Sequence, residues 1–204
     1  MDIAPIYHGT NARFSQFEQS KSRIQNDFYG GGVAYFTDAL SVAKTYAKSA
    51  AKKGGDPIIY QVTLKSNKLF DVDAKFTGDK LIQFFSRKDA EQFARGAGLL
   101  NLGADKYKVI GEIEDGHMTL TGDQVFRGLS QGMIKTAAAR EKLKQLGYDA
   151  LRHNGGVNMN MATKHNVYLA YHAYNIKITE RMIAASENTI KEGVLGSQER
   201  YVLI

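Results

Sequence analysis

A histidine, a glycine and a threonine stand together near the start of the chain, at His8, Gly9 and Thr10. They follow a short apolar run that predicts a strand, so an imidazole, an unhindered backbone and a hydroxyl meet where this strand ends. A single histidine beside a strand more often bonds a backbone group than takes part in catalysis. The glycine after it favours a functional role, because glycine lets a ligand approach the backbone closely. The stretch is therefore a candidate ligand site.

Two tyrosines, Tyr35 and Tyr46, form a second candidate site. Tyr35 follows three glycines in an expected strand, and Tyr46 lies eleven positions later in an expected helix. The end of a strand and the second turn of the next helix can face each other, so two phenol rings there can form the walls of a slot for a flat aromatic ring. Both tyrosines can also be core residues. The small residues Ala43 and Ala47 beside Tyr46 favour the slot, because they leave room for a ligand.

Composition narrows the possible chemistry. The 204 residues include no cysteine, which excludes disulfides, thiolate zinc sites and a cysteine nucleophile, and the five histidines and scattered acids lack metal-motif spacing, so we expect no metal. A net charge of +6 favours an anionic partner, although the spread of the basic residues also fits a solvated surface. We find neither a long apolar stretch nor a secretory signal, and we expect a cytoplasmic protein that does not bind a membrane.

Short strands and helices of unequal length alternate irregularly along the chain. We expect strands at 3–8, 33–36, 58–64, 69–72, 148–151, 166–171 and 176–178, helices at 39–52, 124–129 and 134–146, and a helical region at 79–100. Asp115-Gly116 predicts a hairpin turn within residues 108–120, and Asp38 is a good N-cap for the first helix. The series is not a regular βαβ repeat. It favours an α+β fold with a mostly antiparallel, split sheet.

Taken in order, the motifs "YHGT", "GGGVAYFTD" followed by "SVAKTYA", "LGYDAL" and "VYLAYHAYNIKI" resemble the ADP-ribosyltransferase superfamily. The similarity is to the branch with a His-Tyr-Glu signature, which includes poly(ADP-ribose) polymerases and diphtheria-type toxins. Within it, the chain looks most like the domains found in phage and mobile-element proteins. The resemblance implies an ADP-ribosyltransferase-like split antiparallel β-sheet core with flanking helices over residues 1–178, a helical insert at 79–145 and a C-terminal extension at 179–204.

The resemblance also implies that NAD is the co-substrate. In that case His8 hydrogen-bonds the adenosine ribose, the backbone of Gly9 holds the nicotinamide carboxamide, and Thr10 adds its hydroxyl beside them. Tyr35 and Tyr46 sandwich the nicotinamide ring, and His8 and Tyr35 are the catalytic candidates. Such a grip bends NAD and exposes the bond between nicotinamide and ribose, which favours a dissociative, oxocarbenium-like transition state.

Val167 departs from the family's pattern. The strand before "IKI" usually begins with a glutamate, which bonds the nicotinamide ribose and stabilises the positive charge that develops there; valine at this cofactor-binding position cannot. Candidates to replace the carboxylate are Glu112, Glu114, Asp115 and Asp149, although we expect the aspartate of the "GYD" motif to be structural. The missing glutamate also argues against polymer elongation.

We therefore expect a mono-ADP-ribosyltransferase that moves ADP-ribose from NAD to a host macromolecule, either protein or nucleic acid, and releases nicotinamide. Two alternatives stay open: a catalytically inactive relative that acts by binding NAD, another nucleotide or a partner, and an NAD glycohydrolase that uses water as the acceptor. Residues 155–164, rich in Asn and Met, either contact the acceptor or are a flexible connection. The sequence indicates no oligomeric state.

Overall fold

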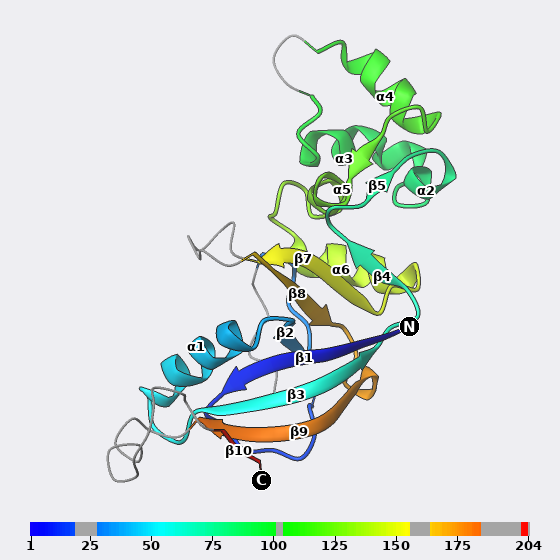
Figure 1. Ribbon diagram of the computed structural model, residues 1–204. Helices are drawn as coiled ribbons and strands as arrows, with labels where there is room; N and C mark the ends of the chain where they lie inside the picture. Colours follow the sequence, from blue (N-terminus) through cyan, green and yellow to red (C-terminus); the bar gives the residue numbers. More distant parts are fainter. Residues whose placement is uncertain (19–27, 101–103, 156–163, 185–200, 204) are drawn as a thin grey trace.

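The computed structural model has a large, mainly antiparallel sheet at its centre (Figure 1). It describes residues 1–18, 28–100, 104–155, 164–184 and 201–203. The strands of the sheet are β1 (Asp2–Thr10), β2 (Ala34–Thr37), β3 (Ile58–Lys65), β4 (Leu69–Asp71), β7 (Ala150–Gly155), β8 (His165–Ala170), β9 (Ile176–Ala184) and β10 (Tyr201–Leu203). They lie in the order β10-β9-β3-β1-β2-β8-β7-β4, and β4 runs parallel to β7. Each predicted strand overlaps an observed one.

Helices flank this sheet. They are α1 (Leu40–Ala51), α2 (Asp79–Ile82), α3 (Ala90–Gly96), α4 (Lys106–Glu114), α5 (Gly122–Leu129) and α6 (Thr136–Gln145), with short 3₁₀ turns η2 (Arg87–Asp89) and η3 (Ala173–Asn175). α1 lies against β1, whereas α2 to α5 gather beyond β4 with the small sheet of β5 (Lys75–Phe76) and β6 (Leu120–Thr121) (Figure 1). The expected α+β fold, an antiparallel sheet with flanking helices, is confirmed.

The sheet has a seam between β1 and β2. β1 pairs with β3 along most of its length, and β2 pairs with β8 at all four of its residues. Between β1 and β2 the register is a single pair, Tyr7 with Thr37. In the described part of the chain, the backbones of the halves β10-β9-β3-β1 and β2-β8-β7-β4 pair at this position alone, and this is the predicted split.

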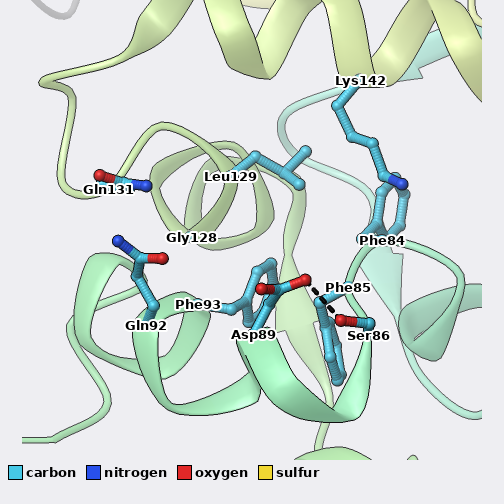
Figure 2. Close-up of a pocket in the computed structure, with 10 residues that line it drawn as sticks. All are labelled: Phe84, Phe85, Ser86, Asp89, Gln92, Phe93, Gly128, Leu129, Gln131 and Lys142. Atoms are coloured by element: carbon cyan, nitrogen blue, oxygen red, sulfur yellow. Dashed lines mark hydrogen bonds between the residues drawn. The ribbon is translucent and has the colours of Figure 1, made fainter.

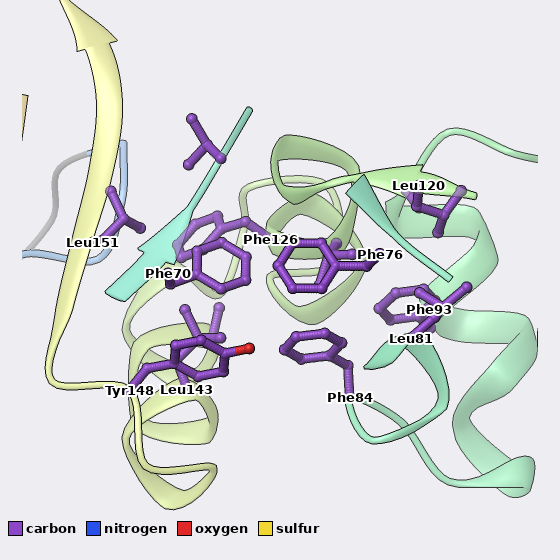
Figure 3. Close-up of a cluster of buried hydrophobic side chains, with 14 of the residues drawn as sticks. Phe70, Phe76, Leu81, Phe84, Phe93, Leu120, Phe126, Leu143, Tyr148 and Leu151 are labelled. Carbon is purple, nitrogen blue, oxygen red and sulfur yellow. The ribbon is translucent and has the colours of Figure 1, made fainter. Parts of the chain in front are cut away.

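A large hydrophobic cluster joins the helical region to one half of the sheet. Phe70 of β4 and Leu151 of β7 pack in it with Phe84, Phe93 and Phe126 of the helical region (Figure 3). The rings of Phe70 and Phe84 meet edge to face, with centroids 6.0 Å apart. Aromatic rings prefer this geometry, and their burial stabilises the fold. The apolar faces of the helices within residues 79–145 thus pack against residues of the sheet.

α4 occupies the region where we expected a hairpin, so that prediction was wrong. Asp105 begins the helix, because its carboxylate accepts hydrogen bonds from the backbone N–H groups of Tyr107 and Lys108. Asp115-Gly116 ends it: Asp115 is the C-cap, and Gly116 adopts a φ of 71°. A glycine in this left-handed conformation terminates helices as readily as it turns hairpins.

Another predicted element also differs from the structure. The region expected to be helical at 79–100 is divided into α2, η2 and α3, and Ser86 between them bonds the carboxylate of Asp89, a local bond that competes with a continuous helix. β9 continues past residue 178, after which we expected a C-terminal extension, and its residues pair with β3 as far as Ile183. Beyond it, β10 pairs with β9, while residues 185–200 lie outside the described part of the chain.

α1 packs unusually closely on β1 at Gly9. A Cβ placed on Gly9 would lie 2.0 Å from the backbone oxygen of Ala43 and 2.8 Å from the backbone nitrogen of Ala47. Both alanines are buried in this contact. The glycine and the two alanines therefore set a short distance between helix and strand. Ala43 and Ala47, which suggested room for a ligand beside Tyr46, are thus part of this packing.

Asp149 is structural, as we expected. Its carboxylate accepts hydrogen bonds from the hydroxyl of Ser66 at 2.6 Å and from the backbone N–H of Asn67 at 2.8 Å. The side chain is buried, and so is Ser66, whereas Asn67 is exposed. It therefore fixes the turn between β3 and β4 to the start of β7.

Replacing Gly9 by alanine should lower the free energy of unfolding by about 1–3 kcal/mol, the usual effect of overpacking. The added methyl meets helix backbone, which cannot rotate away. Chemical denaturation measures the change. Gly111→Ala is the control, because nothing lies within 4 Å of a Cβ there, and in helix α4 it should be neutral or stabilising by about 1 kcal/mol. Equal stability of Gly9→Ala and wild type would contradict the close contact.

Replacing Asp149 by alanine should lower the free energy of unfolding by about 1–3 kcal/mol, because it takes the acceptor away from the buried hydroxyl of Ser66 and from the backbone N–H of Asn67. Asp56→Ala, which removes an exposed ion pair with Arg13, should change it by less than about 1 kcal/mol. Thermal and urea unfolding of both variants give the comparison. A smaller effect at Asp149 than at Asp56 is incompatible with a structural carboxylate.

Candidate active site

Neighbouring residues of the candidate site face opposite sides of the sheet, because side chains alternate along a strand. Gly9 faces α1, and Tyr35, which packs against the large hydrophobic cluster, lies on the same side. His8 and Phe36 face the other side, where their rings are 5.8 Å apart. The pair at the seam fixes this register, so Gly9 comes opposite Tyr35 and His8 opposite Phe36.

His8 spans the seam with its side chain. Its Nδ1 lies 2.8 Å from the backbone oxygen of Tyr35, and because a carbonyl can only accept, Nδ1 carries the proton. The ring packs edge to face on Phe17, with centroids 5.4 Å apart. Burial lowers the pKa of His8, and the hydrogen bond to Tyr35 opposes this effect only in part. The imidazole is therefore held neutral, with Nε2 as its acceptor nitrogen.

Thr10 takes part in the turn that follows β1. The backbone N–H of Ala12 donates to its hydroxyl oxygen at 3.2 Å. This bond gives the threonine a local structural role at the end of the strand. The oxygen that we expected to meet a ligand is therefore already an acceptor within the turn.

Tyr35 and Tyr46 lie on the side of the sheet that α1 covers. Tyr35 is half-buried, and its ring centroid lies 6.4 Å from that of His153 at an angle of 85°. Tyr46 is 45% exposed, which shows that it is not a core residue, and its partial burial raises the pKa of its phenol. Tyr46 follows Ala43 by one helical turn, and Ala43 touches β1 at Gly9. The fold thus brings Gly9 and the two tyrosines to one side, with His8 reaching the same seam from the other.

Val167 lies in a row of residues that crosses the seam. Tyr7 pairs with Thr37, Thr37 with Val167, and Val167 with His153. Paired residues share a face, so all four side chains lie on the side of Tyr35. Val167, where we expected the family's glutamate, therefore lies on the same face as Tyr35 and carries an aliphatic side chain.

None of the carboxylates that we considered as replacements reaches this row. Glu112 and Glu114 belong to α4 and Asp115 caps it, at the end of the helical region remote from β8 (Figure 1). Asp149 is held by Ser66 and Asn67. The sequence contains no Asp or Glu between Asp149 and Glu180, so neither β7 nor β8 contributes one.

His153 is the residue of this row that sequence reasoning missed. It is half-buried, and its ring lies 4.8 Å from that of Tyr29, tilted by 33°. The alternation of side chains along β7 indicated on which face His153 lies, because it places His153 on the same face as Leu151. We had no reason to compare that face with Val167, since the pairing of the two strands was unknown.

Asp38 joins the end of β2 to the start of β8. Its two carboxylate oxygens accept from the backbone N–H of Asn166 at 2.9 Å and from its side-chain amide at 2.7 Å. The predicted role of Asp38 as an N-cap was wrong: the N-cap is Ala39, which has no side-chain bond of this kind. The carboxylate satisfies donors across the sheet instead, and it holds the strand end next to Val167.

A pocket of about 300 Å³ opens in the helical region (Figure 2). Phe84, Phe93 and Leu129 line it with several polar side chains, but none of the predicted site residues does. In the described part of the chain, no group of three or more His, Asp or Glu side chains is placed to hold a metal ion. Among the helices described, none combines the length and apolar character needed to cross a bilayer.

Comparison with known proteins bears on the same residues. A family model described as "ADP-Ribosyltransferase in polyvalent proteins" matches residues 3–185, a range that includes the whole row and the seam. No curated protein and no solved structure matches the chain significantly. The match confirms the resemblance seen in the sequence motifs, including the mobile-element type of domain. With its divided sheet and its motifs in the expected order, the chain belongs to the ADP-ribosyltransferase family of polyvalent proteins.

Proposed function

We propose that this protein is a mono-ADP-ribosyltransferase that uses NAD and modifies a macromolecule. The family makes it a transferase of the ADP-ribosyltransferase class. The observation that carries the proposal for NAD is the hydrogen bond between Nδ1 of His8 and the backbone oxygen of Tyr35. It joins the residue expected to bind one end of the dinucleotide to the residue expected to bind the other.

The residues around the seam suit the two ends of NAD. Nε2 of His8 can accept a hydrogen bond from a hydroxyl of the adenosine ribose, because Nδ1 carries the proton. Tyr46 keeps nearly half of its surface exposed and can stack on a flat ring together with Tyr35. The backbone of Gly9 opposite Tyr35 can bond the carboxamide. These roles of His8, Gly9, Tyr35 and Tyr46 are part of the proposal.

The chemistry places few demands on the protein beyond binding and orientation. When bound, NAD supplies the ADP-ribosyl group: nicotinamide departs with the electron pair of its bond to ribose, and the acceptor provides a new pair and gives up a proton. The tyrosines hold the leaving group, and His8 holds the far sugar. Binding energy from both ends can thus be used to expose the bond that breaks.

Val167 supports transfer of a single unit. Elongation of a polymer requires a group that activates a ribose hydroxyl of the growing chain, and valine has none. The net charge of +6 supports an anionic acceptor, either nucleic acid or an acidic protein of the host cytoplasm. Most of the segment that we considered for acceptor contact, residues 156–163, lies outside the described part of the chain.

A second function has one observation in its favour. The absence of any Asp or Glu between Asp149 and Glu180 removes the usual stabiliser of positive charge from β7 and β8. A relative that binds NAD without turning it over, and acts by docking on a partner, is consistent with this. The two functions differ in whether nicotinamide is released.

Isotopically labelled NAD separates the possibilities. Incubation with lysate of a bacterial host, followed by mass spectrometry of protein and nucleic acid, should show acceptors that carry one ADP-ribose each. Nicotinamide release in buffer alone would identify a glycohydrolase instead. Binding of NAD without release under either condition would identify the inactive relative.

Removing one wall of the proposed slot should weaken the binding of NAD without unfolding the protein. Tyr46→Ala should raise the Kd for NAD about ten-fold or more, since stacking on one aromatic ring contributes roughly 1–3 kcal/mol. Isothermal calorimetry measures the Kd. Tyr107→Ala is the matched control, because Tyr107 is 82% exposed on α4. Equal losses in both variants would count against a slot at Tyr46.

Two substitutions of His8 should separate its roles in folding and in binding. Asparagine retains a donor near the position of Nδ1 but has nothing at the position of Nε2, whereas alanine has neither. We expect His8→Asn to stay closer to wild type in stability than His8→Ala, and both to lose about ten-fold or more in NAD affinity. If His8→Asn binds NAD as wild type does, Nε2 has no part in binding.

The lowered pKa of His8 should also make stability depend on pH. The unfolded chain protonates this histidine near pH 6.5, and the folded chain only at lower pH. The contribution of neutral His8 to the free energy of unfolding is complete above pH 6.5. It is lost as the pH falls from there through the pKa of His8 in the folded protein. Urea unfolding at several pH values should show that the free energy of unfolding falls less at low pH for His8→Asn than for wild type. His172, whose pKa is also lowered, is common to both proteins and cancels.

A further inference from the structure

We propose that His153 of β7 takes the place of the missing glutamate and contacts the ribose next to nicotinamide in bound NAD. This inference rests on the proposed function. It concerns a residue that neither the family resemblance nor the sequence motifs indicate. The role is to bind and orient that ribose at the position where a carboxylate is expected.

The sheet places His153 directly beside the glutamate position. Val167 and His153 are partners in the register of β8 and β7, and both face the side of Tyr35. The ring of His153 meets that of Tyr35 edge to face at 6.4 Å. A ligand ring stacked on Tyr35 therefore has the imidazole within reach of whatever is attached to it.

Aromatic packing fixes the orientation of the imidazole. Tyr29 lies against it at 4.8 Å, and Tyr29 in turn meets Phe126 of α5 edge to face at 5.2 Å. Tyr29 is 6% exposed and belongs to the large cluster, so the ring that supports His153 is held by the core. A side chain held in this way loses little conformational entropy when it binds a ligand.

An imidazole can hydrogen-bond a ribose hydroxyl. Nδ1 of His153 lies 3.2 Å from the backbone oxygen of Asn154, which can only accept, so Nδ1 carries a proton. An imidazole nitrogen can orient a hydroxyl of the ribose, as a carboxylate does.

His165 lies on the same face and is a weaker candidate. It is buried at 8% exposure, and a Cβ on Gly155 would lie 2.2 Å from its Nε2. This histidine thus packs tightly over the neighbouring strand. His153 is half-buried, and a ligand on the Tyr35 side can touch it.

The inference is tested first by binding. Calorimetry of His153→Ala should show a five- to ten-fold higher Kd for NAD, which is the loss of about one hydrogen bond, and an unchanged Kd for AMP, which lacks the second ribose. His117→Ala, at an exposed histidine after α4, should bind both as wild type does. Placing a carboxylate at the family's position, as Val167→Glu in the His153→Ala background, should restore NAD affinity.

A spectroscopic readout does not depend on activity. The side-chain nitrogen signals of His153, assigned by their loss in His153→Ala, should shift on addition of NAD or ADP-ribose but not of nicotinamide or AMP. If wild type binds NAD while these signals stay in place and His153→Ala binds equally well, the role of His153 is disproved and the proposed function stands. If wild type does not bind NAD at all, the role of His153 and the proposed function are both disproved.

Discussion

The hydrogen bond from His8 to the backbone of Tyr35 holds the two halves of the sheet together where their backbones no longer pair. It acts together with the strand pair at Tyr7 and Thr37 and with the apolar packing of Ile6 on β1 and Phe36 on β2. The same bond fixes the tautomer of the imidazole, and burial keeps it neutral. His8 thus has a structural role, and the tautomer fixed by this bond leaves Nε2 as the acceptor that the proposed NAD site requires.

The candidate site contains residues from opposite faces of β1 and β2, so its residues fall into two groups. Gly9, Tyr35 and Tyr46 gather on the side of α1, whereas His8 packs among phenylalanines on the other side. Only a seam in the sheet allows both groups to serve one ligand. The split is therefore a requirement of the proposed site as well as a feature of the fold.

The sequence predicted the fold class, most strands and the motif order, because alternation, turn residues and helical periodicity are local signals. It failed at Asp115-Gly116, since a left-handed glycine ends a helix and turns a hairpin with the same backbone geometry. It did not predict the contact of Gly9 with α1, and it missed His153. Both omissions concern neighbours distant in sequence. Strand register and helix packing decide such neighbours, and no local pattern encodes them.

The contact at Gly9 also governs the dimensions of the proposed slot. Because helix backbone rests on strand backbone there, the distance between α1 and β1 is set by main-chain atoms, which have no alternative rotamer. A larger side chain at this position would push the helix, and the backbone of Tyr46 with it, away from β1. The spacing of the proposed slot thus depends on the absence of a methyl group at Gly9.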